Sequence, residues 1–276
     1  MALTLDSTIT LNNGVEMPRF GLGVFKTEVG AETENAVRWA LEAGYRAVDT
    51  AALYANEAEV GNMVRAGIVP REDVFVTSKV WVDKLNYADT KAAFDESMQK
   101  LGLDYVDLYL VHWPVNDWQG SWRALEEIYA TGRAKAIGVS NFLQHHLEAL
   151  LEIAEIVPVV NQIEFHPYLQ QPSLQDFCRQ QNIAITAWAP LMKGRVLEIP
   201  TLVEIGEKYG KSAVQVTLRW MLQTDIITIP KSAKKERIES NADIYDFELT
   251  ADEIAAINAL DKDDRVGIHP DRFWDR

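Results

Sequence analysis

Residues 44–57 have the sequence GYRAVDTAALYANE, and the rest of the chain can be organised around them. Residues 46–50 predict a short buried strand, because β-favouring side chains stand between the turn residue Gly44 and a pair of small alanines. The strand ends at the carboxylate of Asp49, and Tyr54 follows in the loop before the next helical pattern. An acid and a phenol therefore leave the same end of one strand.

Two later apolar runs end in the same way, with a polar side chain at the carboxyl end of a predicted strand. Lys79 ends one of these runs and His112 ends the other. If the three strands are parallel neighbours, Asp49, Tyr54, Lys79 and His112 converge at one edge of the sheet.

Apolar runs suited to buried strands alternate with helical patterns along the chain. Strands are predicted at residues 20–26, 46–50, 74–79, 106–112, 134–140, 159–165, 183–189 and 226–230. Helices are predicted at residues 31–43, 57–66, 90–101, 122–129, 146–154, 173–181, 202–209, 213–222 and 235–242. Eight β/α units in 276 residues predict an α/β chain that forms one domain, residues 1–276, with the fold of a (β/α)8 TIM barrel.

Additional segments are predicted at both ends of this barrel. Residues 1–18 contain the turn Asn12-Asn13-Gly14 between alternating segments, which predicts an N-terminal β-hairpin that covers one end. Residues 250–260 begin with Thr250 and Glu253 at capping-box spacing and predict an extra C-terminal helix. Residues 261–276 form an irregular C-terminal tail.

The composition excludes several classes of function. A formal net charge of −14 makes nucleic acid and anionic membranes poor partners, since both need basic surfaces.

The single cysteine, Cys178, cannot form an internal disulfide and is expected in the core. The first ten residues lack the pattern of a signal peptide and no apolar run reaches membrane-spanning length, so a cytoplasmic protein is expected. The histidines outside the site lack spaced partner ligands, so no metal is predicted.

The chain resembles a known family, the aldo-keto reductases, and is most similar to their bacterial members of the 2,5-diketo-D-gluconate reductase type. The resemblance covers residues 9–270. It rests on residues 44–61, on KAIGVSNF at residues 135–142, and on IPKS at residues 229–232 with Arg237 and Asn241.

The resemblance implies an enzyme that reduces a carbonyl group, with hydride from a nicotinamide and a proton from Tyr54. A phenol has an ordinary pKa of about 10 and is by itself a slow proton donor at neutral pH. We expect the Lys79 ammonium to lower the pKa of Tyr54, and Asp49 to hold Lys79 in place. The His112 ring would orient the substrate oxygen.

The resemblance also implies NADPH as the cofactor. The opening strand continues as GLGVFK, which stops after two glycines, so a Rossmann site is not expected. By resemblance, the nicotinamide stacks on Trp188. The residues implied for its carboxamide are Ser140, Asn141 and Gln162. Those implied for the phosphate on the adenosine ribose are Lys231, Ser232 and Arg237, and Asn241 is implied for the adenine. Four of the seven residues 231–237 are basic, which favours a dianionic phosphate and therefore NADPH over NADH.

Two departures from the family pattern concern this cofactor site. Ser240 stands where many members have a glutamate near the adenine, so one adenine contact is in doubt. Residues 191–200 are shorter than the loop that covers the pyrophosphate in several eukaryotic members, so a more open site with faster cofactor release is expected.

By the same resemblance, aromatic side chains surround the substrate carbonyl. The residues implied are Phe25, Trp81, His112 and Trp113, with Trp274 as a further candidate. Small aldehydes, dicarbonyls such as methylglyoxal and keto-sugar acids such as 2,5-diketo-D-gluconate are the expected substrates.

Two other functions have to be considered. Tyr87 and Lys91 match the Tyr-x-x-x-Lys pair of short-chain dehydrogenases, but they come too early in the chain and without the glycine-rich turn. The second is a subunit of the same barrel fold that binds the cofactor with little turnover, and the complete set of four polar residues argues against it. A monomer is expected from the resemblance.

Overall fold

The computed structural model describes residues 3–275, so the ends of the predicted domain, residues 1–2 and 276, lie outside the described residues. Its centre is a parallel sheet of eight strands in sequential order from β3 to β10. The strands are β3 (Leu22–Gly23), β4 (Ala47–Asp49), β5 (Phe75–Val80), β6 (Leu108–Val111), β7 (Ile137–Ser140), β8 (Val160–Glu164), β9 (Ala184–Trp188) and β10 (Ile227–Thr228). Parallel bridges from Phe20 to Thr228 and from Gly23 to Lys231 close the sheet into a barrel. The predicted (β/α)8 fold is confirmed.

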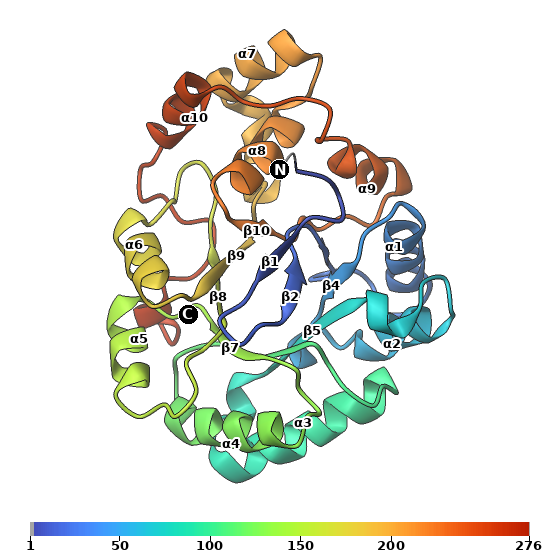
Figure 1. The fold of residues 1–276 in the computed structure, drawn as a ribbon, viewed down its shortest axis with the longest axis vertical. Helices are drawn as coiled ribbons and strands as arrows, with labels where there is room; N and C mark the ends of the chain where they lie inside the picture. Colours follow the sequence, from blue (N-terminus) through green and yellow to red (C-terminus); the bar gives the residue numbers. More distant parts are fainter. Residues whose placement is uncertain (1–2, 276) are drawn as a thin grey trace.

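Helices surround this barrel on all sides (Figure 1). They are α1 (Ala31–Glu42), α2 (Glu57–Arg65), α3 (Tyr87–Leu101), α4 (Trp118–Ala130), α5 (Gln144–Leu151), α6 (Pro172–Gln180), α7 (Pro200–Tyr209), α8 (Ala213–Gln223), α9 (Lys235–Ala242) and α10 (Ala251–Asn258). The predicted extra helix is α10, where Thr250 and Glu253 form the expected capping box. Glu253 also accepts a hydrogen bond from Tyr209 at 2.7 Å, which joins α10 to α7.

The N-terminal hairpin covers the end of the barrel where the strands begin. It consists of β1 (Thr8–Thr10) and β2 (Glu16–Pro18), with Ile9 paired to Met17. The Asn12 amide donates to the Pro158 carbonyl at 3.1 Å, just before β8, and Met17 is buried against residues that line the barrel. Viewed down the shortest axis of the molecule, the hairpin lies inside the ring of helices (Figure 1). It leaves the carboxyl ends of the strands for the site.

Some element boundaries differ from the prediction for local reasons. The first strand, predicted over residues 20–26, has only two residues in β3, because the Thr27 amide turns back to the Val24 carbonyl at 3.2 Å. The fourth helix begins at Trp118, earlier than predicted, because the Asp117 carboxylate caps it by accepting from the Gly120 amide at 2.9 Å.

The core consists mainly of the strands and the helix faces that pack on them. Every residue of β5, β6, β7 and β8 is buried, as expected for parallel strands with helices outside and side chains inside the barrel. Cys178 is buried in this core, as predicted. Within residues 3–275, no helix is long and apolar enough to cross a membrane.

Candidate active site

The four polar residues singled out in the sequence lie together at the carboxyl ends of β4, β5 and β6. The Lys79 Nζ atom donates to Asp49 Oδ1 at 2.6 Å and to the Thr50 carbonyl at 2.9 Å. It also lies 3.4 Å from the Tyr54 hydroxyl. The Lys79 side chain has no exposed area, so its charge depends on these oxygens.

Tyr54 reaches this site from a short 3-10 turn, η1 (Ala52–Tyr54), directly after β4. Ala55, with a φ of 57°, ends the turn in the left-handed region. Asn56 holds the loop from inside, because its buried side chain accepts from the Thr50 hydroxyl at 2.7 Å and donates to the Val24 carbonyl at 3.0 Å. The phenol is thereby fixed beside the end of its own strand.

The pKa of Tyr54 lies well above its ordinary value, opposite to the direction expected from the sequence. Burial of the phenol raises the pKa first, and the nearby Asp49 carboxylate raises it further, although the residue as a whole is only partly buried. Burial also lowers the pKa of Lys79, while Asp49 opposes that shift. The expectation was wrong because it considered the effect of the Lys79 ammonium on the pKa of Tyr54 and left out the effect of burial. Tyr54 is therefore a neutral hydroxyl that carries its proton at neutral pH.

His112 follows β6 and stands beside Tyr54 and Trp81, with ring centroids at 5.9 and 5.0 Å. Burial lowers the pKa of His112 well below its ordinary value, and the Lys79 charge adds to the effect. The ring is therefore neutral, with one N–H to donate. Its Nδ1 atom is buried and has no hydrogen-bond partner within the described part of the chain.

The residues expected to hold the nicotinamide form a connected group next to Asp49. The Ser140 hydroxyl donates to the Gln162 carbonyl at 2.8 Å, and the Gln162 amide donates to Asp49 Oδ2 at 2.7 Å. The Asn141 amide donates to the His112 carbonyl at 2.9 Å and accepts from Trp188 Nε1 at 2.8 Å. Amides, a hydroxyl and an indole face thus lie beside the four polar residues.

The residues expected to bind the adenosine phosphate lie where β10 leads into α9. Lys231 and Arg237 are exposed, Ser232 and Asn241 are buried, and no side chain caps the start of α9. Among residues 3–275, no acid forms an ion pair with Lys231 or Arg237. Unpaired cations beside the amino end of a helix suit a phosphate dianion, so this donor set fits the phosphate of NADPH.

Aromatic side chains form the expected walls around His112 and Tyr54. The Phe25 ring lies 4.8 Å from that of Tyr54 and is 46% exposed. Trp113 and Trp81 both contact Phe273 of the C-terminal tail, with ring centroids at 4.9 and 6.0 Å.

Trp274 is not the tail residue on this wall. It is 64% exposed, whereas Phe273 is buried and lies against the two tryptophans. The 3-10 turn η5 (Pro270–Arg272) sets which aromatic residue points inward, and the irregular tail sequence gave no periodicity from which to predict it.

The histidines outside the site include one cluster that the sequence did not reveal. His145 and His146 of α5 each place Nε2 beside Asp271 Oδ1, at 3.1 and 3.3 Å. The Nδ1 atom of His146 accepts from the Leu143 amide at 3.1 Å, so its Nε2 carries the proton. A protonated nitrogen donates to the carboxylate and does not bind a metal ion. The cluster attaches the tail to α5, and the absence of a metal stays a prediction.

Tyr87 and Lys91, the pair that resembled a short-chain dehydrogenase motif, lie on the outer surface of α3. The Tyr87 hydroxyl donates to Glu127 of α4 at 2.6 Å, and the Lys91 ammonium donates to the same carboxylate at 2.8 Å. They form a surface contact between two helices, which leaves the barrel site as the candidate.

The chain forms a closed (β/α)8 barrel, and an acid, a lysine, a phenol and an imidazole lie at the carboxyl ends of its strands. This fold and this position of the site are those of a TIM-barrel enzyme. The sequence profile of the Aldo/keto reductase family matches residues 20–262. The chain is 53% identical over 274 residues to the glyoxal reductase of Bacillus subtilis, covering 99% of each chain. It is 55% identical over 278 residues to the uncharacterized oxidoreductase YtbE of the same organism, again covering 99% of each. The chain belongs to the aldo/keto reductase family.

Solved structures of other family members have the same fold. An aldo-keto reductase from a Medee basin deep-sea metagenome library matches with a TM-score of 0.93 at 42% identity, covering 95% of this chain and 98% of that one. The Bombyx mori aldo-keto reductase in complex with NADP matches with a TM-score of 0.90 at 37% identity, covering 98% and 97%.

Proposed function

We propose that this protein reduces aldehydes and ketones to alcohols with NADPH, and that Tyr54 is the proton donor. Family membership makes it an NADP-dependent oxidoreductase. The observation that carries the proposal is the placement of the Tyr54 hydroxyl 3.4 Å from Lys79, whose charge Asp49 holds at 2.6 Å.

The four polar residues can perform the proton side of this reaction. When bound, NADPH supplies a hydride to the carbonyl carbon. The neutral His112 donates a hydrogen bond to the carbonyl oxygen and orients it, and Tyr54 gives that oxygen its proton. The phenolate left on Tyr54 is stabilised by the Lys79 ammonium, and Asp49 keeps that ammonium charged and in place.

The preference for NADPH over NADH is assigned to Lys231, Ser232 and Arg237. Only NADPH carries the ribose phosphate, so these residues would contribute little to NADH binding. We assign the nicotinamide carboxamide to Ser140, Asn141 and Gln162, whose polar groups adjoin Asp49 and His112. Asn241 is assigned to the adenine.

The substrates we propose are small aldehydes, dicarbonyls such as methylglyoxal, and keto-sugar acids such as 2,5-diketo-D-gluconate. Phe25, Trp81 and Trp113 would contact the substrate around His112, and one relative is named a glyoxal reductase. The monomeric state and the cytoplasmic location also remain proposals.

The test follows NADPH absorbance with methylglyoxal, 2,5-diketo-D-gluconate and an aromatic aldehyde in parallel, with NADH as the comparison cofactor. Turnover with NADPH and much weaker turnover with NADH is expected. Tight NADPH binding without turnover of any carbonyl would favour the alternative, a cofactor-binding subunit of the same fold.

A further inference from the structure

We propose that Glu164 is a positioning residue that sets the orientation of the Trp188 ring through the backbone of the C-terminal tail. This inference rests on the proposed function in one respect, the assignment of Trp188 as the surface on which the nicotinamide stacks. Glu164 ends β8, and it pairs in register with Trp188, which ends β9. Both residues therefore lie at the end of the barrel that holds the site.

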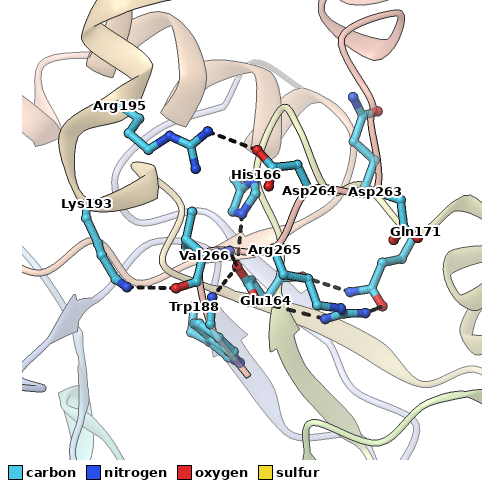
Figure 2. Close-up of polar contacts among 12 residues, drawn as sticks. Glu164, His166, Gln171, Trp188, Lys193, Arg195, Asp263, Asp264, Arg265 and Val266 are labelled. Carbon is cyan, nitrogen blue, oxygen red and sulfur yellow. Dashed lines mark hydrogen bonds and ion pairs between the residues drawn. The ribbon is translucent and has the colours of Figure 1, made fainter. Parts of the chain in front are cut away.

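One oxygen of Glu164 accepts hydrogen bonds from two backbone amides of the tail. Oε1 accepts from the Val266 amide at 2.5 Å and from His166 Nε2 at 3.1 Å (Figure 2). It also accepts from the Gly267 amide at 3.0 Å. The side chains of Glu164 and His166 have no exposed area. Two backbone amides from a segment about a hundred residues away are thus fixed by one buried carboxylate.

The carboxylate is costly to bury and is only partly compensated. Its second oxygen, Oε2, has no hydrogen-bond partner among the described residues, and its nearest cation is Arg265 at 3.9 Å. A neutral amide could fill the same space without a buried charge. The carboxylate accepts hydrogen bonds from two backbone amides at once, and it binds them more strongly than a neutral amide would, because an ionised acceptor forms stronger hydrogen bonds.

The segment that Glu164 holds lies directly against Trp188. A Cβ atom at Gly267 would come within 2.3 Å of the Trp188 Cη2 atom and 3.0 Å of Cζ3, so a larger residue would displace the ring. At the other end of the indole, Nε1 donates to Asn141 at 2.8 Å. The ring is thus fixed along its benzo edge by Gly267 and at its pyrrole end by Asn141.

The tail has other attachments nearby, but they are weaker candidates for this role. Arg195 bonds to Asp264 at 2.9 Å, and both side chains are more than 40% exposed, so solvent screens the pair. Lys193 donates to the Val266 carbonyl at 2.7 Å from an exposed position in the 3-10 segment η4 (Met192–Glu198) (Figure 2). Among residues 3–275, only Glu164 bonds from inside the protein to the amides of Val266 and Gly267, and Gly267 lies against the indole.

The test compares Glu164→Gln with Glu253→Gln. The second variant makes the same chemical change at another buried carboxylate that accepts a backbone amide, far along the chain in the α10 capping box. NADPH affinity is measured by quenching of tryptophan fluorescence without any carbonyl present. Glu164→Gln is expected to weaken NADPH binding about tenfold, because a displaced indole loses its aligned stacking on the nicotinamide, and Glu253→Gln to leave it unchanged.

Two further readouts separate positioning from a merely structural role. In the cofactor-free protein, Glu164→Gln should alter the near-ultraviolet circular dichroism from Trp188, and this difference should vanish in a Trp188→Phe background. The KM for NADPH should rise while the KM for the carbonyl stays constant. Gly267→Ala, whose added Cβ atom would meet the Trp188 ring at 2.3 Å and Glu164 Oε2 at 3.0 Å, should change the same quantities and serves as the second variant if Glu164→Gln does not fold.

An unchanged NADPH affinity in Glu164→Gln would overturn the proposal, and faster hydrogen exchange of the Val266 and Gly267 amides in the same variant would then leave Glu164 as an anchor of the tail only. Failure of the proposed function would look different. In that case the wild-type protein would reduce no carbonyl, while the two glutamine variants would still differ in NADPH affinity.

Discussion

At the scale of single residues, the site depends on a buried ion pair. Lys79 and Asp49 lie 2.6 Å apart with almost no exposed area, and Gln162 donates to the second carboxylate oxygen. Removing one partner leaves an uncompensated charge in the interior. Lys79→Met should therefore destabilise the protein by about 3–5 kcal/mol, measured by urea denaturation. The double variant Asp49→Leu with Lys79→Met should recover part of that loss, and equal or greater destabilisation of the double variant would contradict this account.

The pKa shifts at the site predict a specific pH dependence. The pKa of His112 lies well below 6.5 and that of Tyr54 well above 10, so neither group titrates between these values. The rate constant for reduction, kcat, should therefore stay constant as pH rises through about 6.5, and a fall in rate there would refute the neutral form of His112. The lowered pKa of His112 also makes the stability of the fold depend on pH, because the neutral ring is the favoured form in the folded protein. Below about pH 6.5 the unfolded chain takes up a proton that folded His112 refuses, so this residue makes folding less favourable as pH falls.

The sequence predicted the residues at strand ends well and the residues of the tail poorly. Asp49, Lys79 and His112 each follow an apolar run, so barrel topology alone brings them together. Glu164 also ends a strand, but its role depends on residues 266–267, which no periodicity places beside β8. Phe273 was missed for the same reason. Long-range contacts of irregular segments have no local signal in the chain.

At the scale of elements, the β10–α9 connection is where cofactor preference can be tested. Arg237 is exposed on α9, with no acid paired to it in the described chain. Arg237→Ala should raise the KM for NADPH by about 10- to 100-fold, because one or more charge-assisted hydrogen bonds to phosphate are lost. The KM for NADH should hardly change. Equal increases for the two cofactors would place the phosphate elsewhere, and Arg179→Ala, on the exposed surface of α6, is the matched control.

The elements themselves were predicted from alternation, and their boundaries were set by caps. Side chains of Asn86 and Asp117 accept hydrogen bonds from the first turns of α3 and α4, so both helices begin several residues before their apolar patterns. The predicted capping box at Thr250 was confirmed because both of its partners are close in sequence. The start of a helix can thus be predicted from the sequence when the capping residue is considered together with the apolar periodicity.

At the scale of the whole molecule, stability and chemistry lie at opposite ends of the barrel. Met17 of the hairpin is 2% exposed and packs with Leu11 over the residues that fill the end where the strands begin. Met17→Ala should lower the free energy of unfolding by about 2–5 kcal/mol through the cavity it leaves. The KM values for NADPH and for the carbonyl should stay at their wild-type levels, measured at a temperature where the variant is folded. A changed KM would show that the two ends are coupled.

The proposed reaction depends most on Tyr54, which would supply the proton in an NADPH-dependent carbonyl reduction. The most direct measurement is the rate of NADPH oxidation with methylglyoxal in single turnover, for the wild type and for Tyr54→Phe, with NADPH affinity measured alongside. We expect a rate lower by about 100- to 10,000-fold in the variant, as for the loss of a general acid, with NADPH affinity nearly unchanged. A variant that reduces methylglyoxal at the wild-type rate would contradict it.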